Sequence, residues 1–348
     1  MARTTATEVS QNRRLGNVEI LRFISAAMIV ALHVEILFAP YLNLSAATSA
    51  FLEMRLSAGV DIFFVISGFV IAMNIQRSET TPARFIKARF ARIIPSYWLL
   101  SLATVPLALI FGVGGDTAPA VLPHLASSLF FINDKVGFPF PMLGPGWSLN
   151  LEIFFYVLVF LVMLWPQLRR HTLLISSIVI AGFAYLGSHY QSDGQPLPSG
   201  ENPIVIDFIF GFLAFKLWPK IQGNRTLGWL FAAAAIGALG AANLYPEFAK
   251  RWMYLGVPAF LAFLAALSFP NLTSPRLAKL GFSSYSIYLT QWFVITAAQA
   301  ALQKLHPGLA LSAVGFILLI PFTIACGYMY STLIDSRLYA WARRLAKL

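Results

Sequence analysis

Long apolar runs, separated by short polar segments, follow one another from Val18 nearly to the last residue of the sequence. A run of about 17–25 apolar residues is long enough to cross the hydrocarbon core of a bilayer as an α-helix. The runs close to this length are Val18–Ala39, Ala58–Ile75, Ser96–Val113, Trp147–Trp165, Thr172–Tyr190, Ile204–Trp218, Leu227–Leu244, Trp252–Phe269, Ser283–Leu302 and Leu309–Ile334. The pattern therefore predicts an all-α, polytopic membrane protein with about ten transmembrane helices.

Positive charge falls mainly on one side of these predicted spans. With the N-terminus placed inside, 19 of the 25 Lys and Arg residues lie in inside segments and 5 in outside loops. Cytoplasmic loops carry an excess of Lys and Arg, so both termini are predicted to be cytoplasmic. We expect one membrane-embedded domain over residues 1–348, with cytoplasmic tails at 1–16 and 335–348. The apolar segment Leu125–Ile132 is too short to span and is expected to be interfacial or re-entrant.

Composition supports the same class. Of the 348 residues, 58% are hydrophobic and 11% are charged, whereas an average soluble domain has about a quarter charged residues. Disorder and an ordinary cytosolic enzyme are thereby excluded. The net charge of +11 comes from clusters beside apolar runs, which indicates contact with membrane lipids and not with nucleic acid. The single cysteine, Cys326, excludes an internal disulfide and a cysteine-based metal site, and no metal is expected.

Ionisable residues inside the predicted spans are costly to bury, so each is a candidate for function. Arg22 and His33 lie 11 residues apart on the first span, which places them on one helix face about 16 Å apart. Glu152, Asp61 and Asp207 lie in the outer halves of three other spans.

This distribution indicates a chemistry. Guanidinium groups near the inner side, from Arg22, Arg89 and Arg92, suit the phosphates of a cytoplasmic molecule. A histidine near carboxylates suits general-base work on a hydroxyl, with Glu152 as the group that orients His33. Coenzyme A carries phosphates at one end and a long thiol arm that would span the distance between Arg22 and His33.

Structural alternatives remain open for each of these residues. His33 is also explained as a hydrogen-bonded packing residue, and Arg22 as a side chain that reaches back to the inner interface. The Arg84–Arg92 cluster is also explained as a topology signal that contacts lipid headgroups. Asp61 and Asp207 lie near the ends of their predicted spans, where contact with water at the membrane interface would explain a charged residue without a functional role.

Five segments in a fixed order carry a resemblance to a known family. They are Asn17 through Arg22 to His33, Gly59–Phe69, Arg84–Tyr97, Gly146–Tyr156 and Tyr285–Leu289. Together they resemble the acyltransferase-3 family of integral membrane O-acyltransferases, and within it the branch that acetylates exopolysaccharides. The resemblance covers essentially the whole chain.

The resemblance implies ten helices, cytoplasmic termini, an acyl-CoA donor and acylation of an extracytoplasmic or lipid-linked saccharide. It implies that the His of the Arg–His pair, here His33, is essential for acyl transfer. Other positions that match the family's motifs are Arg22, Arg89, Arg92, Trp147, Ser148 and Glu152. This chain departs from the family at Gln291, where many members have His, so a proton-shuttling role at that position is doubtful.

The resulting hypothesis is a membrane O-acetyltransferase of the bacterial inner membrane. His33, either as base or as transient acyl acceptor, would move an acetyl group from acetyl-CoA to a saccharide hydroxyl, with Glu152 as its partner. Arg22, Arg89 and Arg92 would bind the donor. Residues expected to contact the acceptor or support the site are Asp61, Trp147, Ser148, Asp207, Tyr288 and Gln291. Two alternatives remain: a transporter or flippase of a lipid-linked glycan, and a structural subunit of a polysaccharide-export complex.

Overall fold

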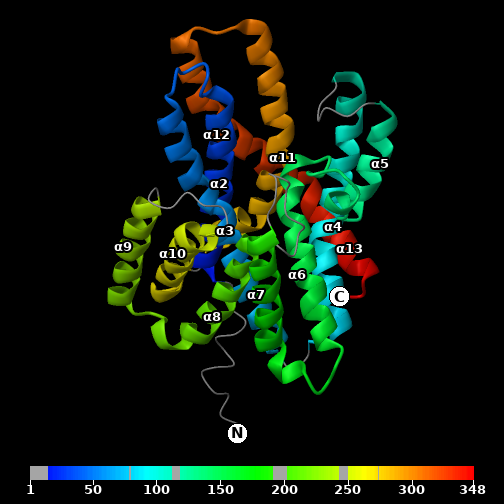
Figure 1. The fold of residues 1–348 in the computed structure, drawn as a ribbon, viewed down its shortest axis with the longest axis vertical. Coiled ribbons are helices and arrows are strands. Elements are labelled where there is room, and N and C mark those ends of the chain that lie inside the picture. Colours follow the sequence, from blue (N-terminus) through cyan, green and yellow to red (C-terminus); the bar gives the residue numbers. More distant parts are fainter. Residues whose placement is uncertain (1–14, 78–79, 112–117, 191–201, 243–249, 273) are drawn as a thin grey trace.

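The computed structural model describes residues 15–77, 80–111, 118–190, 202–242, 250–272 and 274–348 (Figure 1). These residues form helices and connecting turns, and no β-strand occurs among them. The all-α prediction is confirmed for this part of the chain. Each of the ten predicted apolar runs overlaps a helix, although the ends of two runs, at 112–113 and 243–244, lie outside the described residues.

The α-helices of the described chain are α2 (Gly16–Phe38), α3 (Ala46–Ile75), α4 (Pro82–Phe111), α5 (Ala118–Leu129), α6 (Trp147–Met163), α7 (Thr172–Tyr190), α8 (Ile206–Ile221), α9 (Arg225–Ala241), α10 (Val257–Ser268), α11 (Pro275–Leu305), α12 (Leu309–Tyr330) and α13 (Ser336–Leu345). Short 3-10 helices are η1 (Asn133–Lys135), η2 (Gly144–Gly146), η3 (Arg169–His171) and η4 (Pro203–Val205). Two π-helical turns, η7 (Trp252–Gly256) and η8 (Ser331–Asp335), precede α10 and α13.

Six of the described helical segments are long and apolar enough to cross a membrane. They are α2, α3, α4, η2 with α6, η3 with α7, and the continuous stretch from α12 to α13. The segments α9 and η7 with α10 are apolar but shorter. The remaining four spans, and the cytoplasmic position of the termini, stay predictions.

The helices extend beyond several predicted span boundaries. α3 begins at Ala46 instead of Ala58, and α4 begins at Pro82, so the basic segment Arg84–Arg92 is helical. The segment after Ile334, expected as a tail, continues as helix α13. Hydropathy marks only the apolar part of each helix, whereas backbone hydrogen bonding continues the helix into the polar region. The short run at Leu125–Ile132 corresponds largely to α5, which packs beside α4.

The helices are arranged around α2, which contacts both α3 and α11 extensively. In Figure 1, α11 and α12 rise as an antiparallel pair beside α2. The helices α8, α9 and α10 lie at the lower left, and α4, α5, α6 and α13 lie on the right, with α5 in the upper half. Aromatic side chains fill the space between these groups. The rings of Phe155 and Phe208, both fully buried, stack at 3.9 Å between centroids.

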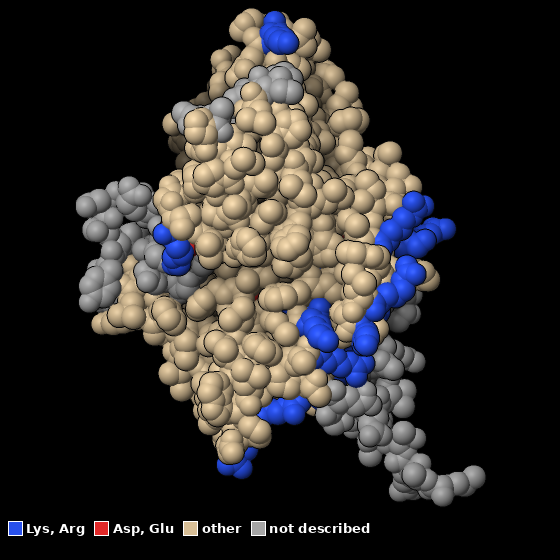
Figure 2. All heavy atoms as spheres, turned by 90° about the vertical axis from the view of Figure 1, so that its right-hand side faces the viewer, with Lys and Arg blue, Asp and Glu red and all other residues tan. Residues whose placement is uncertain are grey.

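The surface of the bundle is apolar over a wide area. Figure 2 shows Lys and Arg in patches in the lower half and at the edges of the view, and a broad uncharged surface above them, with positive charge again at its tip. Exposed side chains such as Ile178, Ile236 and Ile317 are large and apolar. A surface of this kind fits contact with lipid tails.

The contact between α3 and α8 depends on two glycines. A Cβ at Gly68 would lie 2.2 Å from the carbonyl oxygen of Phe208, and a Cβ at Gly211 would lie 2.2 Å from that of Val65. Small residues allow backbones to approach closely in membrane proteins. No larger side chain fits here unless the two helices separate.

We therefore expect Gly68→Ala to lower the stability of the protein in detergent by about 1–3 kcal/mol, because the added methyl group overpacks this contact. Gly237→Ala is the matched control, since a Cβ at Gly237 on α9 meets no atom within 4 Å. Thermal unfolding followed by circular dichroism measures both variants. Equal melting temperatures for both variants would contradict this account of the α3–α8 contact.

Candidate active site

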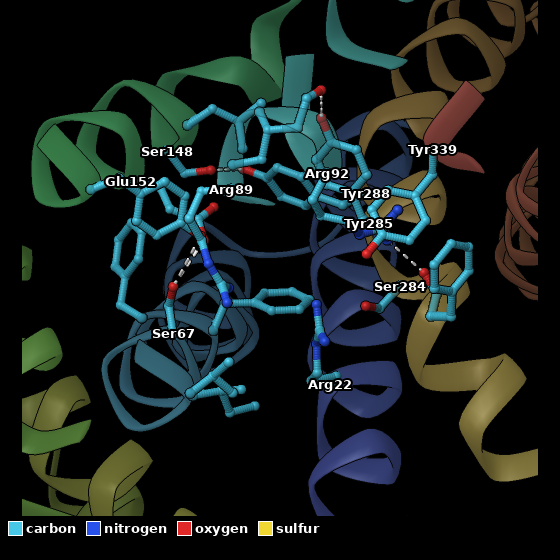
Figure 3. Close-up of a pocket in the computed structure, with 18 of the residues that line it drawn as sticks. Arg22, Ser67, Arg89, Arg92, Ser148, Glu152, Ser284, Tyr285, Tyr288 and Tyr339 are labelled. Atoms are coloured by element: carbon cyan, nitrogen blue, oxygen red, sulfur yellow. Dashed lines mark hydrogen bonds between the residues drawn. The ribbon is translucent and has the colours of Figure 1, made fainter. Parts of the chain in front are cut away.

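A cavity of about 410 Å³ lies between α2, α3, α4, α6, α11 and α13 (Figure 3). Its lining contains residues that are far apart in the sequence, and it includes Arg22, Ser67, Arg89, Arg92, Ser148, Glu152 and Tyr288. Six of these, all except Ser67, were candidates on sequence grounds. The fold thus brings together the predicted donor-binding arginines, one predicted catalytic residue and two predicted support residues.

Arg22 and Arg89 enter the cavity from α2 and α4. Their side chains extend toward one another in Figure 3, and the Nε atoms of both are buried without a hydrogen-bond partner. Glu19, one turn before Arg22, lies 4.0 Å from its guanidinium. Buried guanidinium donors without acceptors are costly, and a bound phosphate or carboxylate would satisfy them.

Arg92 also lines the cavity, but its guanidinium is held by the protein. Nη1 lies 2.8 Å from Oδ2 of Asp335, and Nη2 donates to the carbonyl oxygen of Phe282 at 2.8 Å. The guanidinium carbon lies 4.2 Å and 4.9 Å from the ring centroids of Phe282 and Tyr285. Its first role is therefore to tie α4 to α11 and η8.

Glu152 lies on the wall formed by α3 and α6. Its Oε1 accepts a hydrogen bond from Ser67 Oγ at 2.8 Å and a second from the hydroxyl of Tyr156. Two hydroxyl donors on one oxygen fix the orientation of the Glu152 carboxyl group. Glu152, predicted from the sequence as a functional carboxylate, thus lines the cavity together with Arg89, and Ser67 of α3 holds it in place.

Ser148 and Tyr288 join α6 to α11. The hydroxyl of Tyr288 donates to the carbonyl oxygen of Pro145 at 2.8 Å and lies 2.9 Å from Ser148 Oγ. Both residues also line the cavity. Trp147, the first residue of α6, is partly buried and packs against the core outside the cavity lining.

His33, on α2, lies outside the cavity lining and faces Gln291, which is one helical turn beyond Tyr288 on α11. Its Nδ1 is 2.9 Å from the carbonyl oxygen of Ile29 and 3.1 Å from Oε1 of Gln291. Gln291 Nε2 in turn donates to the carbonyl oxygen of Tyr288 at 2.8 Å. Because that carbonyl can only accept, the Gln291 amide is fixed with its oxygen toward His33.

These contacts determine the tautomer of His33. Both partners of Nδ1 are oxygen acceptors, so in the neutral ring Nδ1 carries the hydrogen and Nε2 keeps a free lone pair. The residue that orients the imidazole is therefore Gln291. Glu152, expected in that role, accepts hydrogen bonds from Ser67 and Tyr156 instead.

Asp61 and Asp207 form a separate cluster with Arg251. Both aspartates are fully buried, and Arg251 Nη2 donates to Oδ2 of Asp61 at 2.7 Å. Asp207 packs against Gly256, where an added Cβ would lie 2.1 Å from its Oδ1. Neither aspartate lines the cavity. Their positions suit a structural role, in which they hold α3, α8 and η7 together.

Sequence reasoning missed Asp335 and Arg251. Asp335 is buried and accepts hydrogen bonds from Ser96 at 2.5 Å and Ser286 at 3.0 Å in addition to Arg92. It was assigned to a tail because it follows directly after an apolar run, and Arg251 was counted as an outside loop cation. A carboxylate buried in a membrane helix needs a cationic partner. The position of Asp61 within an apolar run therefore indicates that a cation such as Arg251 pairs with it.

The family profile of the acyltransferase domain, acyltransferase-3, matches residues 15–332. The chain belongs to this family. Among its relatives is the exopolysaccharide production protein ExoZ of Rhizobium meliloti, 32% identical over 259 residues that cover 70% of this chain and 78% of ExoZ. Nodulation protein 10 of Rhizobium leguminosarum is 28% identical over 270 residues, covering 68% of this chain and 71% of the relative.

The peptidoglycan O-acetyltransferase OatA of Listeria monocytogenes is 24% identical over 328 residues, which cover 80% of this chain and 50% of OatA. The chain thus spans about half the length of that relative. No solved structure matches the chain. Family membership confirms the resemblance carried by the five segments, and it identifies the chain as a membrane O-acyltransferase in preference to a transporter or a structural subunit.

For the buried cluster outside the cavity, we expect Arg251→Leu to lower stability by about 3 kcal/mol, since it leaves Asp61 buried without its cation. The double variant Asp61→Asn with Arg251→Leu should recover part of that loss. Thermal unfolding of the protein in detergent measures both. A double variant no more stable than the single one would contradict the ion-pair account.

Proposed function

We propose that this O-acyltransferase takes an acetyl group from acetyl-CoA at the cytoplasmic side of a bacterial inner membrane and transfers it to a hydroxyl of a surface or lipid-linked saccharide. One observation carries the proposal. The unpartnered guanidinium nitrogens of Arg22 and Arg89 lie in the cavity, and the free Nε2 of His33 lies about 16 Å further along α2. A ligand with phosphates at one end and a thioester at the other matches this separation.

The donor would enter with its phosphates on Arg22 and Arg89. Guanidinium groups bind phosphate oxygens through paired hydrogen bonds, which are strong in a cavity shielded from water. Arg92 shapes the same wall while paired with Asp335. Glu152, fixed by Ser67 and Tyr156, would accept hydrogen bonds from amide N–H groups of the arm.

His33 would then act on the acceptor. Its Nε2 takes the proton of a saccharide hydroxyl while the hydroxyl oxygen attacks the thioester carbon, and the departing sulfur recovers that proton from the imidazolium. Nδ1 keeps its hydrogen throughout and donates it to the carbonyl oxygen of Ile29 and to Oε1 of Gln291, so the ring keeps its orientation. The same lone pair would serve if the acetyl group passed through His33 first.

The saccharide acceptor rests on the relatives. One is named for exopolysaccharide production and another for peptidoglycan O-acetylation, and both names concern carbohydrate polymers. The bacterial organisms of these relatives and the apolar surface of the bundle support a location in the inner membrane.

Replacement of His33 by Ala should lower acceptor-dependent release of CoA by about 10²–10⁴-fold, because it removes the base. The assay is release of free thiol from acetyl-CoA by purified protein, with and without a glycan extract. His171→Ala is the control, since His171 is exposed in η3, away from the cavity.

The acceptor dependence separates the two mechanisms. Release that needs the glycan indicates direct transfer, whereas slow release without glycan, lost in His33→Ala, indicates an acetylated enzyme. Unchanged glycan-dependent release by His33→Ala would refute the role of the imidazole. If the wild-type protein releases no CoA with or without the glycan extract, the proposal that acetyl-CoA is the donor is wrong.

Gln291→Leu should lower the turnover number by roughly ten- to a hundredfold and leave the affinity for CoA unchanged, because only the orientation of His33 is lost. Gln299→Leu, at an exposed position of the same helix, should behave as the wild type. Titration calorimetry and initial rates separate binding from turnover. A loss of affinity with turnover preserved would argue against Gln291 as a positioning residue.

A further inference from the structure

The helix α13 forms part of the cavity although it lies outside the family match, which ends at residue 332. Tyr339 and Arg343 of α13 both line the cavity. In Figure 3, Tyr339 lies beside Tyr285 and Tyr288. The cavity wall thus includes an element that the family profile does not cover.

Asp335 fixes the position of α13. It ends the π-helical turn η8 directly before α13, and its carboxylate binds Arg92 and Ser96 of α4 and Ser286 of α11. The Asp335 side chain is 2% exposed and that of Arg92 is 19% exposed, so the ion pair is largely shielded from water. Breaking a buried pair of this kind is costly, and α13 is therefore held firmly against α4.

Two neighbouring arginines on α13 differ in what they face. Arg343 lines the cavity, and its guanidinium carbon lies 5.9 Å from the centroid of the Tyr339 ring. Arg344 is exposed outside the cavity lining, and its Nε donates to the carbonyl oxygen of Ala340 at 3.4 Å. Arg343 is thus a fourth guanidinium in the cavity, beside Arg22, Arg89 and Arg92.

We propose that α13 is a donor-binding element, in which Arg343 binds a phosphate group of coenzyme A and the Asp335–Arg92 ion pair holds the helix in position. The inference rests on the proposed acetyl-CoA donor. Arg92 is neutralised by Asp335, and the three other cavity arginines still outnumber the two carboxylates that line the cavity, Glu19 and Glu152, so an anionic ligand would balance the excess. Arg343 is exposed at the cavity wall and forms no ion pair with an acidic side chain of the described residues, which suits the charged end of the donor.

The test compares Arg343→Gln with Arg344→Gln in the full chain, each in detergent, with CoA as the probe. Arg343→Gln should raise the Kd for CoA about tenfold, the effect of losing one hydrogen-bonded charge contact. Arg344→Gln should change it by about twofold or less, since Arg344 is exposed outside the cavity lining and would not contact a ligand in the cavity. Arg343→Lys should retain part of the affinity because it keeps the charge.

Repeating the titrations with 3′-dephospho-CoA locates the contact. A loss in Arg343→Gln for both ligands assigns the contact to the diphosphate, and a loss for CoA alone assigns it to the 3′-phosphate. Equal affinity of Arg343→Gln and wild type for CoA would overturn the inference while leaving the proposed donor intact.

Equal weakening by Arg343→Gln and Arg344→Gln would also overturn it, because that result indicates a general charge effect or an anionic lipid headgroup on α13. A wild-type protein that does not bind CoA would overturn both this inference and the proposed donor. The outcomes therefore separate failure of the α13 contact from failure of the proposed function.

Discussion

Burial of charge inside an apolar helical bundle is the constraint on which the structure depends. A charge taken out of water must be paired, or it is retained for binding. Two arginines follow the first course: Arg92 binds Asp335, and Arg251 binds Asp61, each pair linking helices that are distant in sequence. Arg22 and Arg89 follow the second: Arg22 has a 4.0 Å ion pair with Glu19, but the buried Nε atoms of both arginines lack acceptors, and both side chains line one cavity. The arginines of the first kind stabilise the fold, and those of the second kind are available to bind an anion.

The second feature of the account is the fixed orientation of His33. A histidine in a membrane helix can act as a base only if one nitrogen is free and the other is held. Gln291 accomplishes this without titrating itself, because its amide accepts from His33 and donates to Tyr288. Since Tyr288 also lines the cavity and binds Ser148, the same short part of α11 connects the base to the cavity wall.

Hydropathy and motif order predicted much of this arrangement. The first apolar run, Val18–Ala39, differs from α2 by two residues at the start and one at the end, because the helix is apolar over nearly its full length. Arg22 and Arg89 line one cavity, as their shared inner position suggested, whereas Glu152, expected beside His33 in the outer half, lines the cavity of the arginines. Helix α4 was placed less well, since its first turns are basic and no apolar signal marks Pro82 as their beginning.

Partnerships across the bundle could not be predicted, because they depend on how the helices pack and not on local sequence. Asp335 is adjacent to Ile334 in the sequence, yet it binds Arg92, 243 residues earlier. Gln291 meets His33 across 258 residues, and the alternation of apolar and polar positions contains no trace of that contact. Tyr339 and Arg343 likewise reach the cavity only because η8 continues the chain from α12 into α13.

The central claim is that one cavity holds the donor with its phosphates on the arginines and its sulfur toward His33. Electron cryo-microscopy of the full chain in a lipid nanodisc with bound CoA tests this most directly. The account predicts phosphate density beside Arg22 and Arg89, and a sulfur within about 3.5 Å of the place where a hydroxyl bound to His33 Nε2 would lie. Phosphate density at the His33 end, or CoA bound outside the cavity, would contradict it.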